Sequence, residues 1–311
     1  MTGVALSAAL AVGVAACGSD DSSSKSSASS LSGTIKLDGS STVFPFAQAA
    51  AEDFQRANPG VKISVGESGT GGGFEKFCAG ESDISNASRP IDADKEVPAC
   101  AKQGVKYSEV QVANDGIAVV TNKDLGIDCM TTAQLKALWN SASKVSRYKQ
   151  LDASFADQKV ALFGAGTDSG TFDFFTEAIN GEKGDTRKDY SPTEDDNVTV
   201  QGVSGDKGGL GYFGFSYYED NVDKLALVKV DPGSGCVAPS KQTIQDGSYK
   251  PLSRPLFMYL SAAALARPEV KAFMDYVLDN ENAIAETSKI VPSTDEQLTK
   301  AKSALTTAEG Q

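Results

Sequence analysis

Three short segments rich in serine, threonine and glycine could together bind an anion. Each follows a strand-like run and precedes a helix-like run, and they are residues 41–42, 68–73 and 167–171. The first N–H groups of a helix lack intrahelical partners, and the helix dipole favours negative charge there. Any one segment could be a helix cap alone. The three together predict an anion site where strand ends meet helix starts.

The composition excludes several classes of function. The 311 residues carry a formal net charge of −12, whereas a protein that binds nucleic acid needs a basic face. The chain contains no histidine, which excludes Ser-His-Asp or Cys-His catalysis and imidazole metal ligands. We therefore expect no nucleic-acid partner, no metal and no cofactor.

One of the loops also matches an enzyme motif. Residues 168–171 read Asp-Ser-Gly-Thr, as in the loop that carries a catalytic aspartate of acid proteases. Such enzymes need two carboxylates that share a proton. The sequence has no second Asp-Ser-Gly or Asp-Thr-Gly. We predict that the protein is not an enzyme, with an acid protease as the alternative.

The N-terminal region predicts export. Residues 1–16 are apolar, small and uncharged, and they are fewer than the roughly 20 residues of a membrane-spanning helix, so they are typical of a signal peptide. Residues 14–16 and Cys17 resemble a bacterial lipobox, which predicts a lipidated Cys17 and a lipoprotein on the outer face of the cell membrane. Residues 17–32 form a Ser-rich tether. The alternative is an ordinary secretory signal cut nearby. Because no charged region precedes the apolar run, we expect the natural start upstream.

Four further cysteines suggest two disulfides, because an exported chain with an even number of cysteines usually pairs them. Three pairings are possible, and free buried thiols are the alternative. We favour Cys78–Cys100 and Cys129–Cys236, since each pair then falls within one proposed domain.

Strand-like and helix-like runs alternate from residue 33 onward, which predicts an α/β fold with largely parallel pairing. Phe46, Ala50 and Phe54 recur at four-residue spacing and predict one buried helix face. Residues 115–251 read as a self-sufficient block. We therefore predict lobe I from residues 33–114 plus 252–311 and lobe II from residues 115–251.

Several long motifs carry a family resemblance. They are residues 38–45, 68–73, 84–91 and 166–172, with support from residues 200–204 and 211–214. Together they resemble the bacterial phosphate-binding proteins of the phosphate ABC importer. The resemblance runs from about Gly33 to beyond Pro292, which is nearly the whole mature chain.

The resemblance implies a two-lobed periplasmic-binding-protein fold of type II, with mixed sheets flanked by helices and one phosphate in the interlobe cleft. It also implies a monomer that delivers phosphate to a membrane permease. The ligand-binding residues that it implies are Ser41, Thr42, Val43, Ser68, Ser169, Gly170 and Thr171. The sequence does not decide whether Ser88, Asp115 or Ser204 also contacts the ligand.

Two charged positions depart from the best-known branch of that family. That branch has an aspartate where this chain has Arg89, and an arginine just before its Ser-Gly-Thr turn, where this chain has Asp168. The comparison implies that Arg89 is the ligand's cation and Asp168 its acceptor. A carboxylate accepts a hydrogen bond from protonated phosphate and repels sulfate, which carries no proton. A receptor for another oxyanion, such as sulfate or molybdate, is the alternative function.

Overall fold

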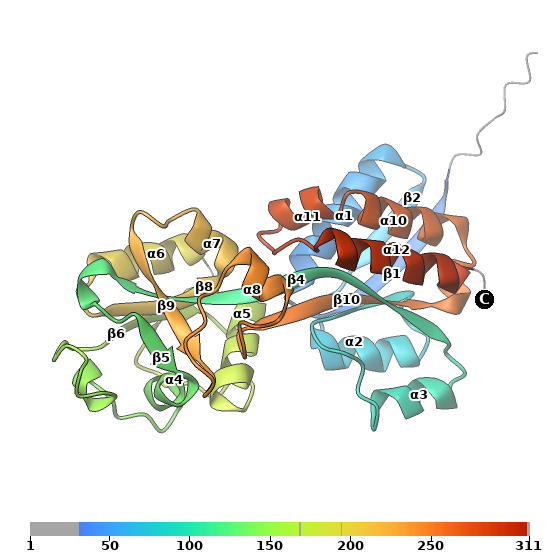
Figure 1. Cartoon of the computed structure of the whole chain (residues 1–311). Coiled ribbons are helices and arrows are strands. Elements are labelled where there is room, and N and C mark those ends of the chain that lie inside the picture. Colours follow the sequence, from blue (N-terminus) through green and yellow to red (C-terminus); the bar gives the residue numbers. More distant parts are fainter. Residues whose placement is uncertain (1–30, 168, 194, 310–311) are drawn as a thin grey trace, which may run out of the picture. The chain divides into compact units, whose positions relative to one another are not determined.

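Strands and helices alternate along most of the chain, which confirms the α/β class (Figure 1). The computed structural model describes residues 31–167, 169–193 and 195–309. The predicted signal peptide, Cys17, residues 17–30 of the tether, and Asp168 lie outside these ranges. None of the described helices is both long and apolar enough to cross a bilayer.

The described strands are β1 (Gly33–Gly39), β2 (Val61–Val65), β3 (Ile84–Ala87), β4 (Tyr107–Asn122), β5 (Cys129–Thr131), β6 (Ala161–Ala165), β7 (Ser191–Thr193), β8 (Gly209–Gly214), β9 (Leu225–Asp231) and β10 (Ser253–Ser261). The described α-helices are α1 (Phe44–Ala57), α2 (Gly69–Cys78), α3 (Glu96–Lys102), α4 (Thr132–Trp139), α5 (Gly170–Phe175), α6 (Asp196–Gly205), α7 (Phe215–Glu219), α8 (Lys241–Gln245), α9 (Ala262–Leu265), α10 (Pro268–Asp279), α11 (Glu281–Thr287) and α12 (Asp295–Glu309). Short 3₁₀ turns are η1 (Lys123–Leu125) and η2 (Tyr148–Gln150), and a π-helical turn, η3 (Thr176–Asn180), continues α5.

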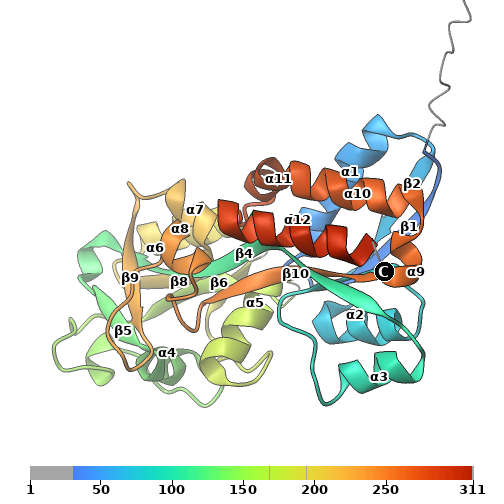
Figure 2. The ribbon, with the colours of Figure 1, turned by 45° about the vertical axis from the view of Figure 1, so that its right-hand side comes forward.

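The first part of the sheet has helices on both faces. β1 lies between β2 and β3 in parallel pairing, and β10 joins β3 to β4 in antiparallel pairing. Figures 1 and 2 show α1, α10, α11 and α12 on one face and α2 and α3 on the other. Phe46, Ala50 and Phe54 are buried on α1, as their spacing predicted, and Pro45 lies in its first turn.

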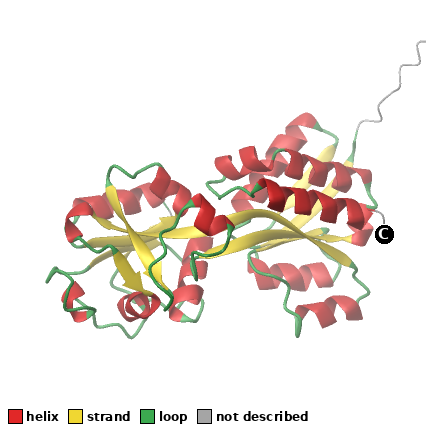
Figure 3. Ribbon diagram, in the orientation of Figure 1, coloured by secondary structure: helices red, strands yellow, loops and turns green. Residues whose placement is uncertain are grey.

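The second part of the sheet continues from the far end of β4 (Figure 3). β4 pairs antiparallel with β8 and β9, while β6 pairs parallel with β7 and β8. The prediction of largely parallel pairing is therefore only partly right, because the two long strands β4 and β10 are antiparallel to their main neighbours. Their apolar runs alone do not reveal a direction. The predicted mixed sheet flanked by helices is confirmed.

Two main apolar cores lie along β4. One core contains Val110, Val112 and Ala113 from β4 and packs against α1 and α10, whereas the other contains residues 117–120 and packs against α4, α5 and α6. At β10 the change of core falls between Leu252, just before the strand, and Leu256 on it. The crossing lies where Gly116, Asp115 and Asn114 oppose residues 253–255 across the two strands.

Both predicted disulfides are confirmed. Cys78 at the end of α2 is bonded to Cys100 of α3, and Cys129 of β5 is bonded to Cys236 after β9. Each bond ties a short peripheral element to its neighbour. The first belongs to a small apolar cluster that also includes Phe74.

Candidate functional site

A cavity of about 320 Å³ lies where several helix starts converge. Its lining comes from the turn before α1, the start of α2, the segment after β3, the α5–η3 helix, the following loop and β10. The lining residues are Ser40, Ser41, Thr42, Ser68, Gly69, Thr70, Gly71, Gly72, Ser88, Arg89, Gly170, Asp173, Phe174, Glu177, Lys183 and Arg254. Segments far apart in the sequence thus build one polar hollow.

The turn before α1 offers backbone donors to this cavity. The Ser40 N–H donates to Asn86 O at 2.9 Å, which fixes the turn to β3. Among the described residues, neither the Ser41 N–H nor the Thr42 N–H has a protein acceptor. Val43 differs, because its N–H donates to Ser40 O at 3.2 Å and its side chain is buried in the core. Ser41 and Thr42 are therefore the donors that this turn presents, and the predicted role of Val43 gains no support from its geometry.

Gly170 at the start of α5 touches that turn. A Cβ atom built on Gly170 would lie 2.6 Å from Thr42 N and 2.7 Å from Ser41 Oγ. Atoms of real side chains do not approach this closely, so only glycine fits. Two of the three predicted turns therefore meet directly at the cavity.

Arg254 of β10 is the best-anchored cation of the cavity. Its guanidinium donates to Thr42 Oγ1 at 2.6 Å and to Ser88 Oγ at 3.1 Å, and it stacks 3.6 Å from the ring centroid of Phe174. Because both hydroxyls accept from Arg254, their own protons can point to a ligand. Arg254 thereby orients two donors besides presenting its own charge.

Asp115 holds Arg254 in place from the neighbouring strand. The two residues are direct cross-strand partners, with Nε and Oδ2 3.3 Å apart. Their side chains are only 15% and 14% exposed. Burial raises the pKa of the Asp115 carboxyl, although the Arg254 guanidinium opposes that shift. Burial also lowers the pKa of Arg254, and Asp115 opposes it in turn. Each partner thus offsets the desolvation of the other.

Arg89 lines the cavity but is committed to another carboxylate. Its two terminal nitrogens donate to the Glu96 carboxylate at 2.9 and 2.7 Å, and its side chain is 42% exposed. This bidentate pair raises the pKa of Arg89. Glu96 lies at the start of α3, seven residues along the chain. The ligand-cation role of Arg89 stays a prediction, and Arg254 is a second candidate for it.

The start of α2 is held by a carboxylate of β1. Ser68 donates from both its N–H and its hydroxyl to Asp38 Oδ1, at 3.0 and 2.6 Å. The hydroxyl of Ser68 therefore lines the cavity with its proton already engaged. Thr70 Oγ1 lies 3.0 Å from Ser88 Oγ and accepts from the Ser88 N–H at 3.2 Å. Thr70 and Ser88 extend the hydroxyl network that starts at Arg254.

The loop before α5 contributes mainly its cap. Ser169 Oγ accepts from the Thr171 N–H at 3.1 Å, so the Thr171 N–H is engaged within the helix start. Neither residue is among those that line the cavity. Their ligand contacts stay predictions, as does the role of Asp168, which lies outside the described residues.

The chain resembles known proteins along most of its length. A model of the PBP superfamily domain matches residues 24–281. The chain belongs to the PBP superfamily. Within it, the chain is 46% identical over 268 residues to Protein SphX of Synechococcus elongatus, covering 85% of this chain and 79% of that protein. It is 39% identical over 304 residues to the phosphate-binding protein PstS of Staphylococcus saprophyticus, covering 97% and 92%.

A solved structure supports the same family membership. A possible phosphate binding protein from Planctomyces limnophilus matches with a TM-score of 0.85 and 45% identity, over 90% of this chain and 99% of that one. The resemblance to the bacterial phosphate-binding proteins and the periplasmic-binding-protein fold are thus confirmed for this PBP superfamily member.

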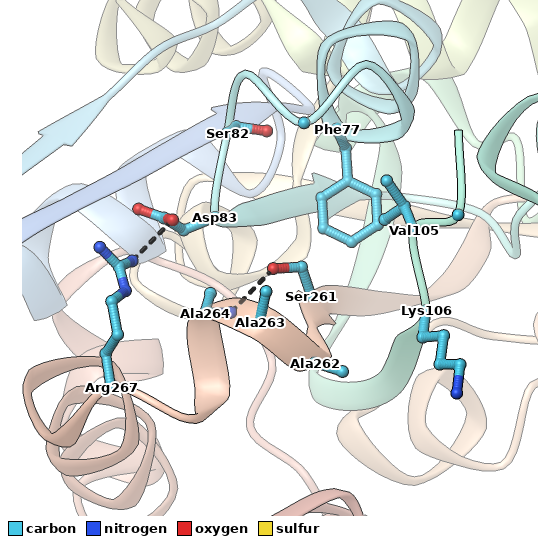
Figure 4. A pocket seen from close by; sticks show the side chains of 12 residues that line it. Phe77, Ser82, Asp83, Val105, Lys106, Ser261, Ala262, Ala263, Ala264 and Arg267 are labelled. Carbon is cyan, nitrogen blue, oxygen red and sulfur yellow. Dashed lines mark hydrogen bonds and ion pairs between the residues drawn. The ribbon is translucent and has the colours of Figure 1, made fainter.

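A larger cavity elsewhere in this superfamily member is not lined by converging helix starts. Figure 4 shows this hollow of about 560 Å³ between the ends of α2 and α3 and the start of α9. Its Arg267 is paired with Asp83 at 2.6 Å and donates to Thr34 O at 3.1 Å. None of the predicted ligand residues lines it. We therefore place the functional site at the smaller cavity.

Arg254 is a functional candidate that the sequence analysis missed, as is Lys183, which also lines the cavity. Arg254 lies 212 positions from Thr42, on a strand whose pairing partner could not be read from the sequence. A weak signal existed, because Arg254 stands between Ser253 and Pro255 at the start of an apolar strand. Of the residues left open, Ser88 lines the cavity and Asp115 anchors Arg254, whereas Ser204 donates to Gln201 O instead.

Proposed function

We propose that this protein captures inorganic phosphate outside the cytoplasm and delivers it to the permease of an ABC importer. The observation that carries the proposal is the cluster of Arg254, Thr42 and Ser88, with free N–H groups beside it, at the crossing of the two cores. The phosphate-binding relatives support the choice of ligand. The proposed role needs no catalysis.

The donors of the cavity suit a small tetrahedral anion that keeps a proton. Arg254 and Arg89 are each paired with a carboxylate, so most donors to the ligand are uncharged N–H and hydroxyl groups. Such donors can bind an oxyanion whether or not it is fully deprotonated. A protonated oxyanion such as phosphate near neutral pH fits this environment.

We propose that binding closes two lobes, residues 33–114 plus 252–311 and residues 115–251. The division between the two apolar cores supports most of these boundaries, although Leu252 and Val291 of the first lobe pack in the second core. Gly170 belongs to the second lobe and touches Thr42 of the first, so the described arrangement corresponds to a closed one. A ligand that contacts both lobes would shift the population toward closure.

The N-terminal predictions complete the proposed role. We propose that residues 1–16 direct export, that Cys17 is lipidated, and that residues 17–32 tether a monomer to the outer face of the membrane. The sequence of this region supports these points. Mass spectrometry of the mature protein, for a diacylglyceryl-modified Cys17, tests the anchor.

Calorimetric titration of the purified protein with phosphate and with sulfate tests the function. We expect a dissociation constant for phosphate in the micromolar range or below, and binding of sulfate at least about a hundredfold weaker, as expected for one mismatched buried charge. Comparable affinities would favour the alternative of a general oxyanion receptor. Absence of phosphate binding would contradict the proposal.

Thr42→Val tests the site while leaving the Arg254–Asp115 pair intact. Valine has nearly the shape of threonine but lacks the hydroxyl, so we expect phosphate affinity to fall about tenfold, the usual effect of one lost hydrogen bond to a charged ligand. Thr299→Val, on the exposed face of α12, is the control and should bind like the wild type. An unchanged affinity of Thr42→Val would remove this hydroxyl from the site.

A further inference from the structure

Lys183 reaches across the mouth of the cavity. It lies in a turn that follows η3, between Gly181 and Gly184, which adopt φ values of 89° and 83°. The Gly184 N–H donates to Thr176 Oγ1 at 2.9 Å, which anchors the turn to the helix that supplies Asp173. Lys183 therefore projects from a short, anchored turn beside the cavity that it lines.

The ammonium group of Lys183 stands between the two sides of the cavity. Its Nζ lies 2.6 Å from Asp173 Oδ2 on α5. A Cβ atom built on Gly69, at the start of α2, would lie 3.9 Å from the same Nζ. The ammonium thus lies between α5, which packs on the second core, and the start of α2, on the other side of the cavity.

Of the three cations that line the cavity, Lys183 is the least committed. Arg254 and Arg89 are bonded to carboxylates that are only 14% and 12% exposed. Lys183 itself is 59% exposed, and its partner Asp173 is 26% exposed. Exposed ion pairs are weak and easily exchanged with water or with another anion. Lys183 can therefore leave and regain Asp173 as a ligand passes.

We propose that Lys183 is the gate of the phosphate cavity, which it closes electrostatically and sterically after the anion has entered. The proposal rests on the phosphate-binding function proposed above. In the closed arrangement, the ammonium faces an outgoing anion from the mouth, and its attraction opposes release. Its main effect is therefore on the rate of dissociation.

The test measures the release of radiolabelled inorganic phosphate after dilution into an excess of unlabelled phosphate. We expect Lys183→Met to release the label about tenfold faster than the wild type, the size expected of one partly exposed charge interaction. Lys183→Arg should stay near the wild-type rate, because it keeps the charge. Lys188→Met, which removes a charge from an exposed position of the same loop outside the cavity, is the matched control.

Salt provides a second readout that a merely structural lysine would not give. At about 1 M salt the screening length is about 3 Å, so the difference in release rate between wild type and Lys183→Met should shrink. Equal release rates at low salt, or an equal acceleration in Lys188→Met, would overturn the gate. Wild type that fails to retain any label would instead contradict phosphate binding itself, so the two failures are distinct.

Discussion

At Arg254, one side chain links the charge, the hydrogen bonding and the packing of the cavity. The guanidinium pairs with Asp115, donates to Thr42 and Ser88, and stacks on Phe174. Few other side chains could combine a planar fork of donors with a flat face for an aromatic ring. The same geometry makes Arg254 a positioning residue for the two hydroxyls.

A single proton should decide which oxyanion the protein prefers. We predict that Asp168→Asn relaxes discrimination between phosphate and sulfate more than it weakens phosphate binding, because asparagine can donate to an unprotonated oxyanion. Calorimetric titration of the variant with both anions measures the change in their affinity ratio. An unchanged ratio would contradict the predicted role of Asp168.

Sequence reasoning succeeded for local features of the site and failed for distant ones. Ser41, Thr42 and Gly170 line the cavity, and they could be predicted because helix starts leave a local pattern of hydroxyls and glycine. Arg254 was missed because Asp115 becomes its neighbour only through the antiparallel register of β4 and β10, and Thr42 only through the sheet order β1-β3-β10. The pairing of Arg89 with Glu96 was also missed, since opposite charges seven residues apart do not predict a contact across a turn.

Among the elements that build the cavity, the start of α5 packs very closely on another element. It packs so closely on the turn before α1 that its first residue has room for hydrogen only. The constraint concerns the contact between two elements rather than the conformation of the helix. A substitution of Gly170 therefore tests whether α5 must contact the turn before α1.

Gly170→Ala should weaken phosphate binding at least about tenfold, because the added methyl group would hold the two helix starts apart. The stability of the fold should change little, since alanine is at least as good a helix former as glycine. Calorimetry and thermal unfolding measure the two effects. Gly205→Ala, in α6, is the control, because its Cβ would meet nothing within 4 Å. Wild-type affinity in Gly170→Ala would mean that ligand binding does not need this close contact.

The prediction of elements was most accurate where the hydrophobic period was clear. The face of α1 that holds Phe46, Ala50 and Phe54 is buried, as their four-residue spacing predicted. The direction of β4 and β10 was not predictable, because fully buried strands show continuous apolar runs without an orientation. The π-helical turn η3, which brings Glu177 to the cavity, has no recognised sequence pattern.

For the whole molecule, the two disulfides close loops of very different length. Cys129 and Cys236 are 107 positions apart, whereas Cys78 and Cys100 are 22 positions apart. A cross-link restricts the unfolded chain more when the loop is longer. The long-range bond should therefore matter more for stability.

Replacing Cys129 and Cys236 together by alanine should lower the free energy of unfolding by about 5 kcal/mol, and replacing Cys78 and Cys100 by about 3 kcal/mol. Urea denaturation of the two double variants and the wild type measures both losses. Each double variant serves as the control of the other, because both remove two sulfurs. An equal loss, or a larger loss for the short loop, would contradict an origin in the unfolded chain.

The two strands that join the cores also limit how the cores can move relative to each other. β4 passes through both cores over 16 residues, and β10 lies hydrogen-bonded beside it at the crossing. We expect two adjacent connections to oppose sliding and most twisting between the proposed lobes, so that bending about a line near Asp115 is the main motion. Arg254 lies on that line, close to the pivot, where a rotation displaces atoms least. We therefore expect Arg254 to stay nearly in place while the parts of the cavity farther from the pivot move apart.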